Sequence, residues 1–492
     1  MDPTETMDII EQTAWLFSPQ LALLLASGVL LGLDALRPRR SLRRWAPAVA
    51  LLGLAAALVA TAALWAGEPS GFSWFATDAF GLAIDGIVLV STGLVILIAS
   101  VIIQTRPNPH HGGFYALLLL SAMAASLAGT ASDLVVIVLA LELFSATSYF
   151  VIGYLRGTPR SGEAAIKFFG YAAATSAVMV YGLSWLYGVT GTTQLAGIAA
   201  GLEAVGEAAR PTLILPMILI TAGLAAKMAA VPFHQWLPDV YEGTSSPITA
   251  YVASGPAIAG FAVMGRLFLT GIPASAGPIA IDWRTLLMAL AALSMLAGGL
   301  VALWQRDARR LLAYVAIGQT GCLLIGLVTA SPQGVTALLL GLAAYVLGLL
   351  GAVAALVALS HRTRSYAIKS YAGMHQQAPE VTWPLFLCLL SLTGIPPTAG
   401  FISRLALFSA AIESGLLWLA VVGVVSSVVS AASVWKLIRI LFIIPTRPDE
   451  RLKVAPALAV ALGIASLGVI AVTVFASPLS ALAQTAAQTL FP

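Results

Sequence analysis

The sequence departs from lipid-compatible chemistry in one stretch, Lys227-Met228-Ala229-Ala230-Val231-Pro232-Phe233-His234-Gln235-Trp236-Leu237-Pro238-Asp239-Val240-Tyr241-Glu242-Gly243, which directly follows the apolar run 213–226. A lysine at membrane depth costs about 2.5 kcal/mol or more unless it faces a polar cavity or a partner. Pro232 also removes a helical hydrogen bond, which a membrane helix tolerates only where other groups satisfy the freed backbone. The stretch therefore predicts a broken helix that carries an ion pathway at mid-membrane.

The composition of the whole chain is that of a membrane protein. Hydrophobic residues make up 59% of the 492 residues and charged residues only 9%, whereas soluble domains contain about 25% charged residues. Apolar stretches long enough to span a bilayer recur from end to end, without the strand-length alternation of a barrel. We therefore predict an all-α polytopic membrane protein, with the lipid bilayer and no nucleic acid among its partners. Cys322 and Cys388 lie in apolar runs and form neither a metal-binding spacing nor a disulfide framework.

Length and apolarity predict about 14 transmembrane helices. We expect them near residues 17–35, 46–66, 79–103, 112–129, 132–154, 163–188, 211–231 with a broken extension to 241, 246–269, 285–304, 309–329, 334–359, 380–410 with a break, 416–441 and 454–475.

The basic residues between these spans are strongly asymmetric. If the first connection is cytoplasmic, only Arg210, Arg266 and Arg284 fall on the opposite side. The positive-inside rule then supports an even number of spans with both termini outside. The residues on the cytoplasmic side are Arg37, Arg39, Arg40, Arg43, Arg44, Arg106, Arg156, Arg160, Arg306, Arg309, Arg310, Arg362, Arg364, Lys369, Arg439, Arg447, Arg451 and Lys453.

A second broken segment mirrors the first. Ser391-Leu392-Thr393-Gly394-Ile395-Pro396-Pro397-Thr398-Ala399-Gly400-Phe401-Ile402-Ser403-Arg404 again places glycine and proline inside an apolar span beside a cation. In the topology above, the Lys227 span enters from outside and the Arg404 span from inside. Two interrupted segments of opposite direction indicate an inverted-topology repeat with ion sites at the breaks.

Glu142 is the best candidate partner for Lys227, because it stands near the centre of an apolar span. An isolated carboxylate at that depth takes up a proton, whereas a nearby lysine keeps it ionised. A pair of this kind is a protonation switch: when the two groups separate, the lysine loses its stabilising partner and can release its proton. A permanent structural ion pair is the alternative.

Two further candidates lie near the first break. Lys167 follows Glu163 by four residues about one turn inside its span, so it either joins the proton path or forms a surface pair and reaches to the cytoplasm. His234 follows Pro232 and either relays protons near neutral pH or caps exposed backbone.

Three other charged residues are expected to lie at the surface. Asp239 and Glu242 are expected to end the broken segment there. Lys436 lies at the cytoplasmic end of a span, as an interfacial anchor or a proton exit group.

Several motifs occur together in one known family. They are Val231-Pro232-Phe233-His234-Gln235-Trp236-Leu237-Pro238-Asp239-Val240-Tyr241-Glu242-Gly243 followed by Ser246-Pro247, Leu139-Ala140-Leu141-Glu142-Leu143, Glu163-Ala164-Ala165-Ile166-Lys167-Phe168, Tyr181-Gly182 with Gly188-Val189-Thr190-Gly191-Thr192, and Gly394-Ile395-Pro396-Pro397-Thr398-Ala399-Gly400-Phe401. From about residue 80 to 445 the chain thereby resembles subunit N (the ND2 type) of respiratory complex I, the proton-translocating NADH:quinone oxidoreductase.

The resemblance implies an antiporter-like fold of 14 helices with two inverted five-helix repeats, in which helices 7 and 12 are broken. Mapped on this chain, residues 1–110 hold helices 1–3, residues 111–270 the first repeat with helices 4–8, residues 271–445 the second repeat with helices 9–13, and residues 446–492 helix 14.

The resemblance also implies a role. The chain is expected in a bacterial plasma (inner) membrane, in the membrane arm between antiporter-like and small subunits, coupling quinone reduction elsewhere in the complex to proton movement. It carries no redox cofactor of its own, because NADH and quinone are bound by other subunits. Glu142 matches the family's fifth-span glutamate, Lys167 its sixth-span lysine, Lys227 its central seventh-span lysine, and His234 its Pro-Phe-His motif.

Two positions depart from the family pattern. Ala257 stands where the family has an eighth-span lysine, and Arg404 replaces its twelfth-span lysine. Because arginine holds its proton far more tightly than lysine, Arg404 is a poor relay and a good electrostatic gate. A subunit that is structural and no longer conducts is therefore one alternative. Another alternative is an antiporter subunit of a cation/proton exchanger or of a membrane-bound hydrogenase. The run 239–243 favours complex I over both.

Overall fold

The structure is a computed structural model that describes residues 11–36, 42–67, 70–72, 74–103, 111–154, 159–205, 210–272, 278–444 and 452–491. Part of the predicted charge asymmetry lies outside the described residues. This concerns both chain ends, residues Arg37, Arg39, Arg40, Arg106, Arg156, Arg447 and Arg451, and the side chains of Arg43, Arg44 and Arg210.

Long apolar helices make up nearly all of the described chain. The first half contains α2 (Ser18–Leu36), α3 (Leu42–Trp65), α4 (Ala79–Ile103), α5 (His111–Thr130), α6 (Leu134–Gly153), α7 (Pro159–Thr190), α8 (Leu195–Val205), α9 (Arg210–Lys227), α10 (Trp236–Gly243), α11 (Ser246–Arg266) and the π-helical η2 (Leu267–Gly271). The second half contains α12 (Pro278–Ala302), α13 (Ala308–Val328), α14 (Pro332–Thr363), η4 (Ile368–Tyr371), α15 (Met374–Gln377), α16 (Pro379–Thr393), α17 (Ala399–Glu413), α18 (Leu417–Phe442), α19 (Pro456–Val474) and α20 (Ala476–Gln488).

The predicted all-α membrane fold is confirmed. Within the described ranges, 12 helices are long and apolar enough to cross a membrane. The broken pairs α9–α10 and α16–α17 stand at the other two predicted positions, each divided close to the expected proline. Several boundaries were wrong by four residues or more; α12, for example, begins at Pro278 and not near residue 285. Another is the start of α7 at Pro159, a residue type favoured in the first turn of a helix, so Lys167 lies about two turns inside α7 rather than one.

Several short elements were not predicted. They are the antiparallel hairpin of β1 (Ser70–Phe72) and β2 (Phe75–Thr77), in which Ser70 pairs with Thr77, and the helices α8, η4, α15 and α20. These elements are too short to be found by the length expected of a membrane span. The expected last span at 454–475 corresponds to α19, and α20 follows it.

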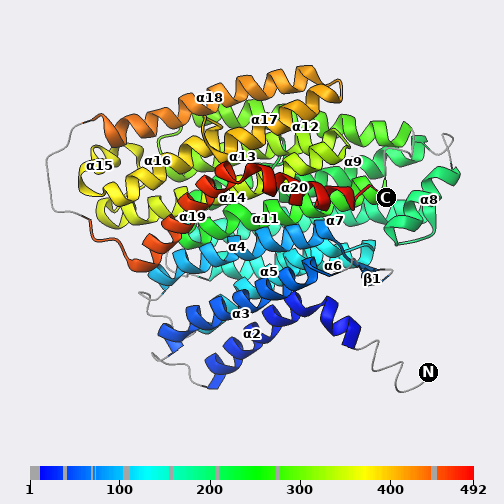
Figure 1. Ribbon diagram of the computed structural model, residues 1–492, viewed down its shortest axis with the longest axis horizontal. Coiled ribbons are helices and arrows are strands. Elements are labelled where there is room, and N and C mark those ends of the chain that lie inside the picture. Colours follow the sequence, from blue (N-terminus) through cyan, green and yellow to red (C-terminus); the bar gives the residue numbers. More distant parts are fainter. Residues whose placement is uncertain are drawn as a thin grey trace.

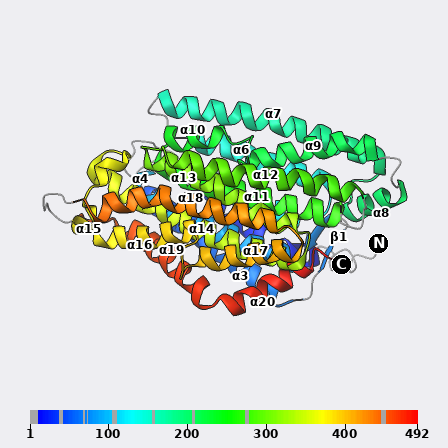
Figure 2. The same ribbon diagram turned by 90° about the horizontal axis from the view of Figure 1, so that it is seen from above.

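The long helices lie side by side along the longest axis of the molecule (Figures 1 and 2). In Figure 1, α2 and α3 form the lower edge and α18 the upper edge, while α11, α13 and α14 lie between them. In the apolar span of each of these three central helices, 94% of the residues are buried. Such helices are hydrophobic all round because they contact other helices on every side.

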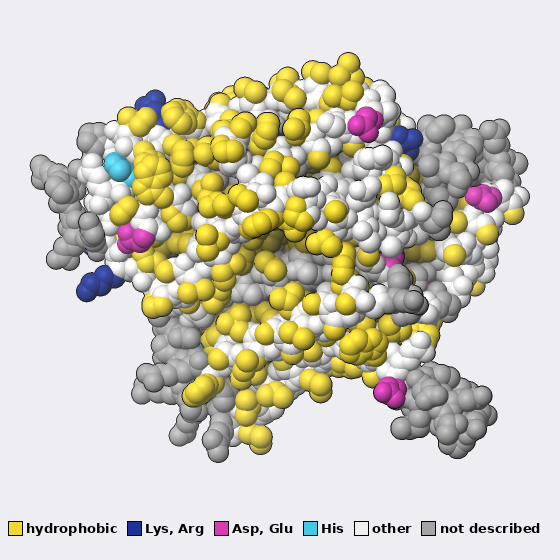
Figure 3. Space-filling view, viewed as in Figure 1, with side chains coloured by type: hydrophobic (Ala, Val, Ile, Leu, Met, Phe, Trp, Pro, Cys, Tyr) yellow, Lys and Arg dark blue, Asp and Glu magenta, His cyan; other side chains and the backbone are white. Residues whose placement is uncertain are grey.

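The outer surface matches a bilayer environment. Figure 3 shows hydrophobic side chains over most of one face, with the charged side chains gathered toward its two ends. The exposed hydrophobic residues include Leu25, Leu52, Leu139, Val428 and Leu467. Exposure of this kind is unfavourable in water and expected against lipid tails or neighbouring subunits.

Side chains satisfy the backbone groups freed at the first break. Trp236 Nε1 donates to Ala226 O (2.9 Å), Thr320 Oγ1 donates to Met228 O (3.2 Å), and Val231 N donates to Ser294 Oγ (2.9 Å). Two of these groups come from the neighbouring helices α12 and α13. The irregular backbone is therefore buried in protein, as its position at membrane depth requires.

The second break depends on a close approach between its two helices. Gly400 N, at the start of α17, donates to Ser391 Oγ in α16 (3.1 Å). A Cβ atom built on Gly400 would overlap the carbonyl oxygen of Ser391. Because that neighbour is backbone, it cannot move aside without displacing α16.

We expect Gly400→Ala to destabilise the assembled protein by about 1–3 kcal/mol, the usual cost of overpacking. Thermal denaturation in detergent measures the change. Gly28→Ala is the matched control, because a Cβ on Gly28 meets nothing within 4 Å. Equal melting temperatures for the two variants would contradict the packing argument.

Candidate functional site

Lys227 is the last residue of α9, and its side chain is buried, with 7% of its area exposed. The free carbonyl groups at a helix C-terminus carry partial negative charge and favour a cation there. The break therefore ends the helix at this lysine, in the last turn, where the helix dipole favours a positive charge.

Three side chains surround the ammonium group of Lys227. Nζ donates to Ser145 Oγ of α6 and to Ser176 Oγ of α7, both at 2.9 Å. Glu142 Oε1 lies 3.7 Å away, which is longer than the 2.7–2.9 Å typical of a charge-assisted hydrogen bond. The predicted Glu142–Lys227 ion pair is thus present, but the serines make the shorter contacts.

Glu142 links the buried lysine to the surface of the chain. Its side chain is 41% exposed, while Oε1, which faces Lys227, is buried and has no hydrogen-bond partner among the described residues. Leu139 and Phe150 flank it on the same helix face and are also exposed. One member of the ion pair therefore lies inside the helix bundle and the other at its edge.

A cavity of about 20 Å³ adjoins the ion pair. That is enough room for a single water molecule. Its polar lining comes from Lys227, Ser145, Thr175, Tyr171 and Trp236. A proton leaving the ammonium group has hydroxyl groups and a water-sized space next to it.

Lys167 lies apart from this site in a charged network at the α7–α10–α13 junction. Its Nζ is 2.8 Å from Glu163 and 3.1 Å from Asp239, and its side chain is 49% exposed. Arg310 binds the other oxygen of Asp239 at 3.2 Å and Glu242 at 2.8 Å. The surface pair with Glu163 is therefore present, and Asp239 and Glu242 hold α10 against α13 in addition to ending the segment.

His234 lies in the turn between α9 and α10. It is partly buried, and its ring centroid is 6.4 Å from that of Tyr314 in α13. The hydrogen bonds of Lys227 do not include it. Its position is next to the break but outside the immediate surroundings of the ammonium group.

Arg404 is buried at the second break and contacts four acceptors. Its guanidinium group donates to the carbonyls of Leu392 (2.7 Å) and Thr393, which are the last two residues of α16. It also donates to Gln319 Oε1 (2.6 Å) and Ser427 Oγ (2.8 Å). All four acceptors are uncharged, so the negative end of the α16 dipole supplies the electrostatic complement.

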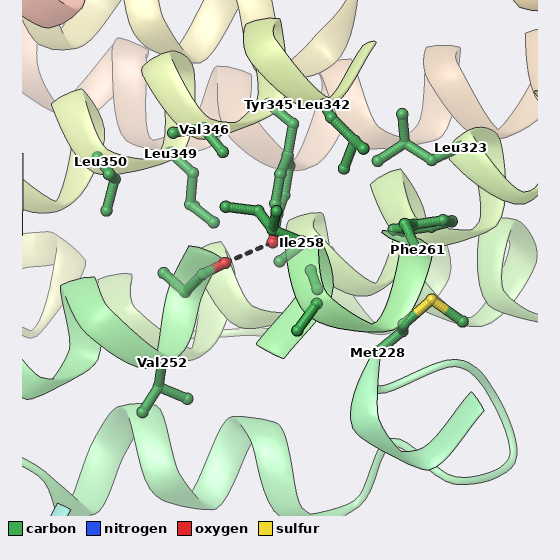
Figure 4. Close-up of a cluster of buried hydrophobic side chains, with 14 of the residues drawn as sticks. Met228, Val252, Ile258, Phe261, Leu323, Leu342, Tyr345, Val346, Leu349 and Leu350 are labelled. Carbon is green, nitrogen blue, oxygen red and sulfur yellow. Dashed lines mark hydrogen bonds between the residues drawn. The ribbon is translucent and has the colours of Figure 1, made fainter. Parts of the chain in front are cut away.

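Ala257, the position of the missing lysine, is buried in α11. One turn before it, Ala253 O accepts a hydrogen bond from Tyr345 of α14 (2.7 Å), as Figure 4 shows. Ile258, Leu342, Val346 and their aliphatic neighbours surround this bond. The packing around Ala253 and Ala257 is therefore apolar except for this tyrosine hydroxyl group.

Ser145, Ser176 and Gln319 were not among the site residues predicted from the sequence. Ser145 follows Glu142 by three residues, and that helical spacing places both on one side of α6, so a search around Glu142 finds it. Ser176 and Gln319 come from helices far away in the sequence, where a lone serine or glutamine carries no signal.

Comparison with known proteins gives a consistent result. Residues 131–430 match the family described as NADH:quinone oxidoreductase/Mrp antiporter, TM. NAD(P)H-quinone oxidoreductase subunit 2 of Trichodesmium erythraeum (strain IMS101) is 39% identical over 84% of this chain and 78% of its own length. A chain of respiratory complex I from Thermus thermophilus is 28% identical, with a TM-score of 0.79 over 95% of this chain and 99% of that one. A chain of the Mrp complex from Dietzia sp. DQ12-45-1b, at 23% identity, shares the fold with a TM-score of 0.83 over 97% of each chain.

Proposed function

Because this chain belongs to the NADH:quinone oxidoreductase/Mrp antiporter family of membrane subunits, we propose that Lys227 and Glu142 carry its proton translocation. The chain is an antiporter-like membrane subunit of an NAD(P)H:quinone oxidoreductase of the complex I type, and it works with the other subunits of the membrane arm. What remains to be assigned is the group that moves the proton.

The single observation that carries this proposal is the environment of Lys227. A buried ammonium group at the end of a broken helix has two neutral serines at 2.9 Å and one carboxylate at 3.7 Å. The serines hold the group in place in either protonation state, because a hydroxyl group can donate as well as accept. The carboxylate is the component whose approach or withdrawal changes how strongly the ammonium charge is stabilised.

The proposed step moves one proton. While Glu142 is close, the ammonium form of Lys227 is stabilised. When a redox-linked change elsewhere in the complex draws Glu142 away, an uncompensated buried charge is costly. Lys227 then passes its proton to a water molecule in the adjoining cavity, which becomes a hydronium ion and hands the proton on, and Lys227 is protonated again when Glu142 returns. The exposure of Glu142 at the edge of α6 suits it to sense a neighbouring subunit.

We further propose that Arg404 acts through its charge and does not relay protons. Its contacts with the carbonyls that end α16 favour this role, and so does the tight binding of a proton by guanidinium. A second half that does not conduct is the alternative, favoured by the apolar packing around Ala257 and Tyr345.

The remaining assignments are also proposals. We place the chain at the subunit N position, in a bacterial plasma membrane with both termini outside, as two inverted repeats over residues 111–270 and 271–445. We propose that it binds no redox cofactor. We propose that Lys167 and His234 belong to the cytoplasmic side of the proton path. In this orientation, both lie next to the cytoplasmic end of the first break.

Glu142→Gln tests the assignment. It keeps the size of the side chain and removes the charge that acts on Lys227. We expect the purified complex in proteoliposomes to reduce quinone while translocating fewer protons per electron. Glu413→Gln is the matched control, because Glu413 is an exposed carboxylate at the end of α17 and is not part of the proposed path. An unchanged proton-to-electron ratio in Glu142→Gln would exclude Glu142 as the switch.

A further inference from the structure

A column of hydroxyl groups runs between α4, α5, α6 and α11, away from the helix breaks. Tyr251 of α11 hydrogen-bonds Ser148 of α6 at 2.6 Å and Ser121 of α5 at 2.5 Å. Ser91 of α4 donates to Ser254 of α11 at 2.6 Å. All five side chains are buried.

The column has room for water and begins close to Lys227. A cavity of about 20 Å³ lies among Ser91, Ser121, Tyr251 and Ser254, which is enough for one water molecule. Ser148 follows Ser145 by three residues on α6, about one helical turn, and Ser145 accepts the hydrogen bond from Lys227. Hydroxyl groups that both donate and accept therefore lead from the ammonium site into the α4–α5–α11 interface.

A buried carboxyl group lies elsewhere on α4, toward its N-terminus. Asp85 is 1% exposed, and neither of its oxygens has a hydrogen-bond partner among the described residues. The hydroxyl group of Ser126 lies next to it and accepts from Gln20 Nε2 (2.7 Å). Gln20 Oε1 is likewise buried and unpaired among these residues.

Among the described residues, Asp85 forms no ion pair. Arg266 forms a bidentate ion pair with Asp78, with both contacts at 2.5 Å, and donates to Gly129 O (2.8 Å). Isolated buried charges are costly, so Asp85 is stable in this place as a neutral acid or with a cation that approaches during turnover.

Asp34 shows what a structural carboxylate in the same helices looks like. It is also buried, at 6% exposure, but its two oxygens accept from the backbone N–H groups of Gly112 (3.4 Å) and Gly113 (3.2 Å). These bonds fix the start of α5 against α2. Asp85 makes no comparable bonds, so packing alone does not account for a carboxyl group there.

We propose that Asp85 is a proton-binding group at the outer end of this hydroxyl column, through which protons released at Lys227 leave the first half of the subunit. The assignment rests on the proposed role of Lys227 and the proposed orientation, in which the N-terminus of α4 faces outside. Asp85 and Ser91 are six residues apart, about 9 Å along the helix, so the proposed path requires bridging water molecules between the cavity and the carboxyl group.

The step changes only O–H bonds. The carboxylate of Asp85 binds the proton that arrives along the column and becomes the neutral acid. It then releases that proton past the Asp78–Arg266 pair, at the end of α11, toward the outer aqueous phase. The carboxylate is regenerated, and no electron donor or second reactant takes part.

The test compares Asp85→Asn, Asp85→Glu and Asp34→Asn in the complete complex. The readouts are the proton-to-electron ratio in proteoliposomes and the infrared difference spectrum between oxidised and reduced complex. We expect Asp85→Asn to lower the ratio and to lose a carboxyl C=O band, and Asp85→Glu to restore both, with the band shifted. We expect Asp34→Asn to keep the band and the ratio in whatever complex assembles.

Ser91→Ala tests the same path if Asp85→Asn prevents assembly of the complex. It interrupts the hydroxyl column without altering the carboxyl group of Asp85. It is expected to lower the ratio and to leave the infrared band in place. An unchanged ratio in Ser91→Ala, or in assembled Asp85→Asn, overturns the proposal when Lys227→Ala lowers the ratio in the same assay. If Lys227→Ala is also without effect, the proposed function itself has failed.

Discussion

Replacing Lys227 with alanine in the assembled complex is expected to abolish the share of proton translocation that passes through this subunit. Removing a positioned proton-transfer group slows such a step by about 100-fold or more. The variant also leaves Ser145 and Ser176 without their cationic partner. The measurement is the proton-to-electron ratio of the reconstituted complex during NAD(P)H-driven quinone reduction.

The matched control is Lys369→Ala, which removes an exposed lysine from η4. It is expected to leave the ratio and the assembly of the complex unchanged. Equal ratios for Lys227→Ala, Lys369→Ala and the unmodified complex would refute proton transfer through Lys227. The Glu142–Lys227 pair would then be a permanent structural ion pair.

Arg404→Leu is expected to have the largest effect on stability. The substitution leaves the carbonyls of Leu392 and Thr393 and the side chains of Gln319 and Ser427 without their common donor. Hydrogen bonds to a charged group contribute about 1.5–3 kcal/mol each, and buried unpaired acceptors add a penalty. We expect a loss of about 3 kcal/mol or more, measured as a lower denaturation temperature and as less subunit in the purified complex.

Arg404→Lys keeps a positive charge at this position and tests how much the hydrogen bonds of the guanidinium group stabilise the end of α16. An ammonium group has three donors and no planar fork, so it reaches fewer of the four acceptors, and we expect intermediate stability. Arg160→Leu, at an exposed position at the start of α7, serves as the control for loss of an arginine. A fully stable Arg404→Leu complex would contradict the expectation that the hydrogen bonds of Arg404 stabilise the end of α16.

Much of the site was predictable because membrane chemistry makes certain residues conspicuous. Glu142, Lys227 and Arg404 are charged residues in apolar spans. Pro232 and the pair Pro396-Pro397 mark the two helix breaks that the structure contains. Asp85 is also a charged residue in an apolar span, but it lies outside the motifs that indicate the two repeats. Ser145 and Ser176 escaped notice because serine is common in membrane helices and only its neighbours give it a role.

The sequence by itself determined the class of the fold, the places where two helices break and the charged residues that membranes tolerate only for a reason. Lipid imposes these features locally, because each span has to satisfy its own backbone and exclude charge. The tertiary structure alone decided which groups meet. Lys227 contacts two serines and the carboxylate of Glu142, Arg404 contacts the end of α16, and Asp85 lies next to Ser126 without a hydrogen-bond partner among the described residues. Such contacts join residues far apart in the chain, so no local pattern encodes them.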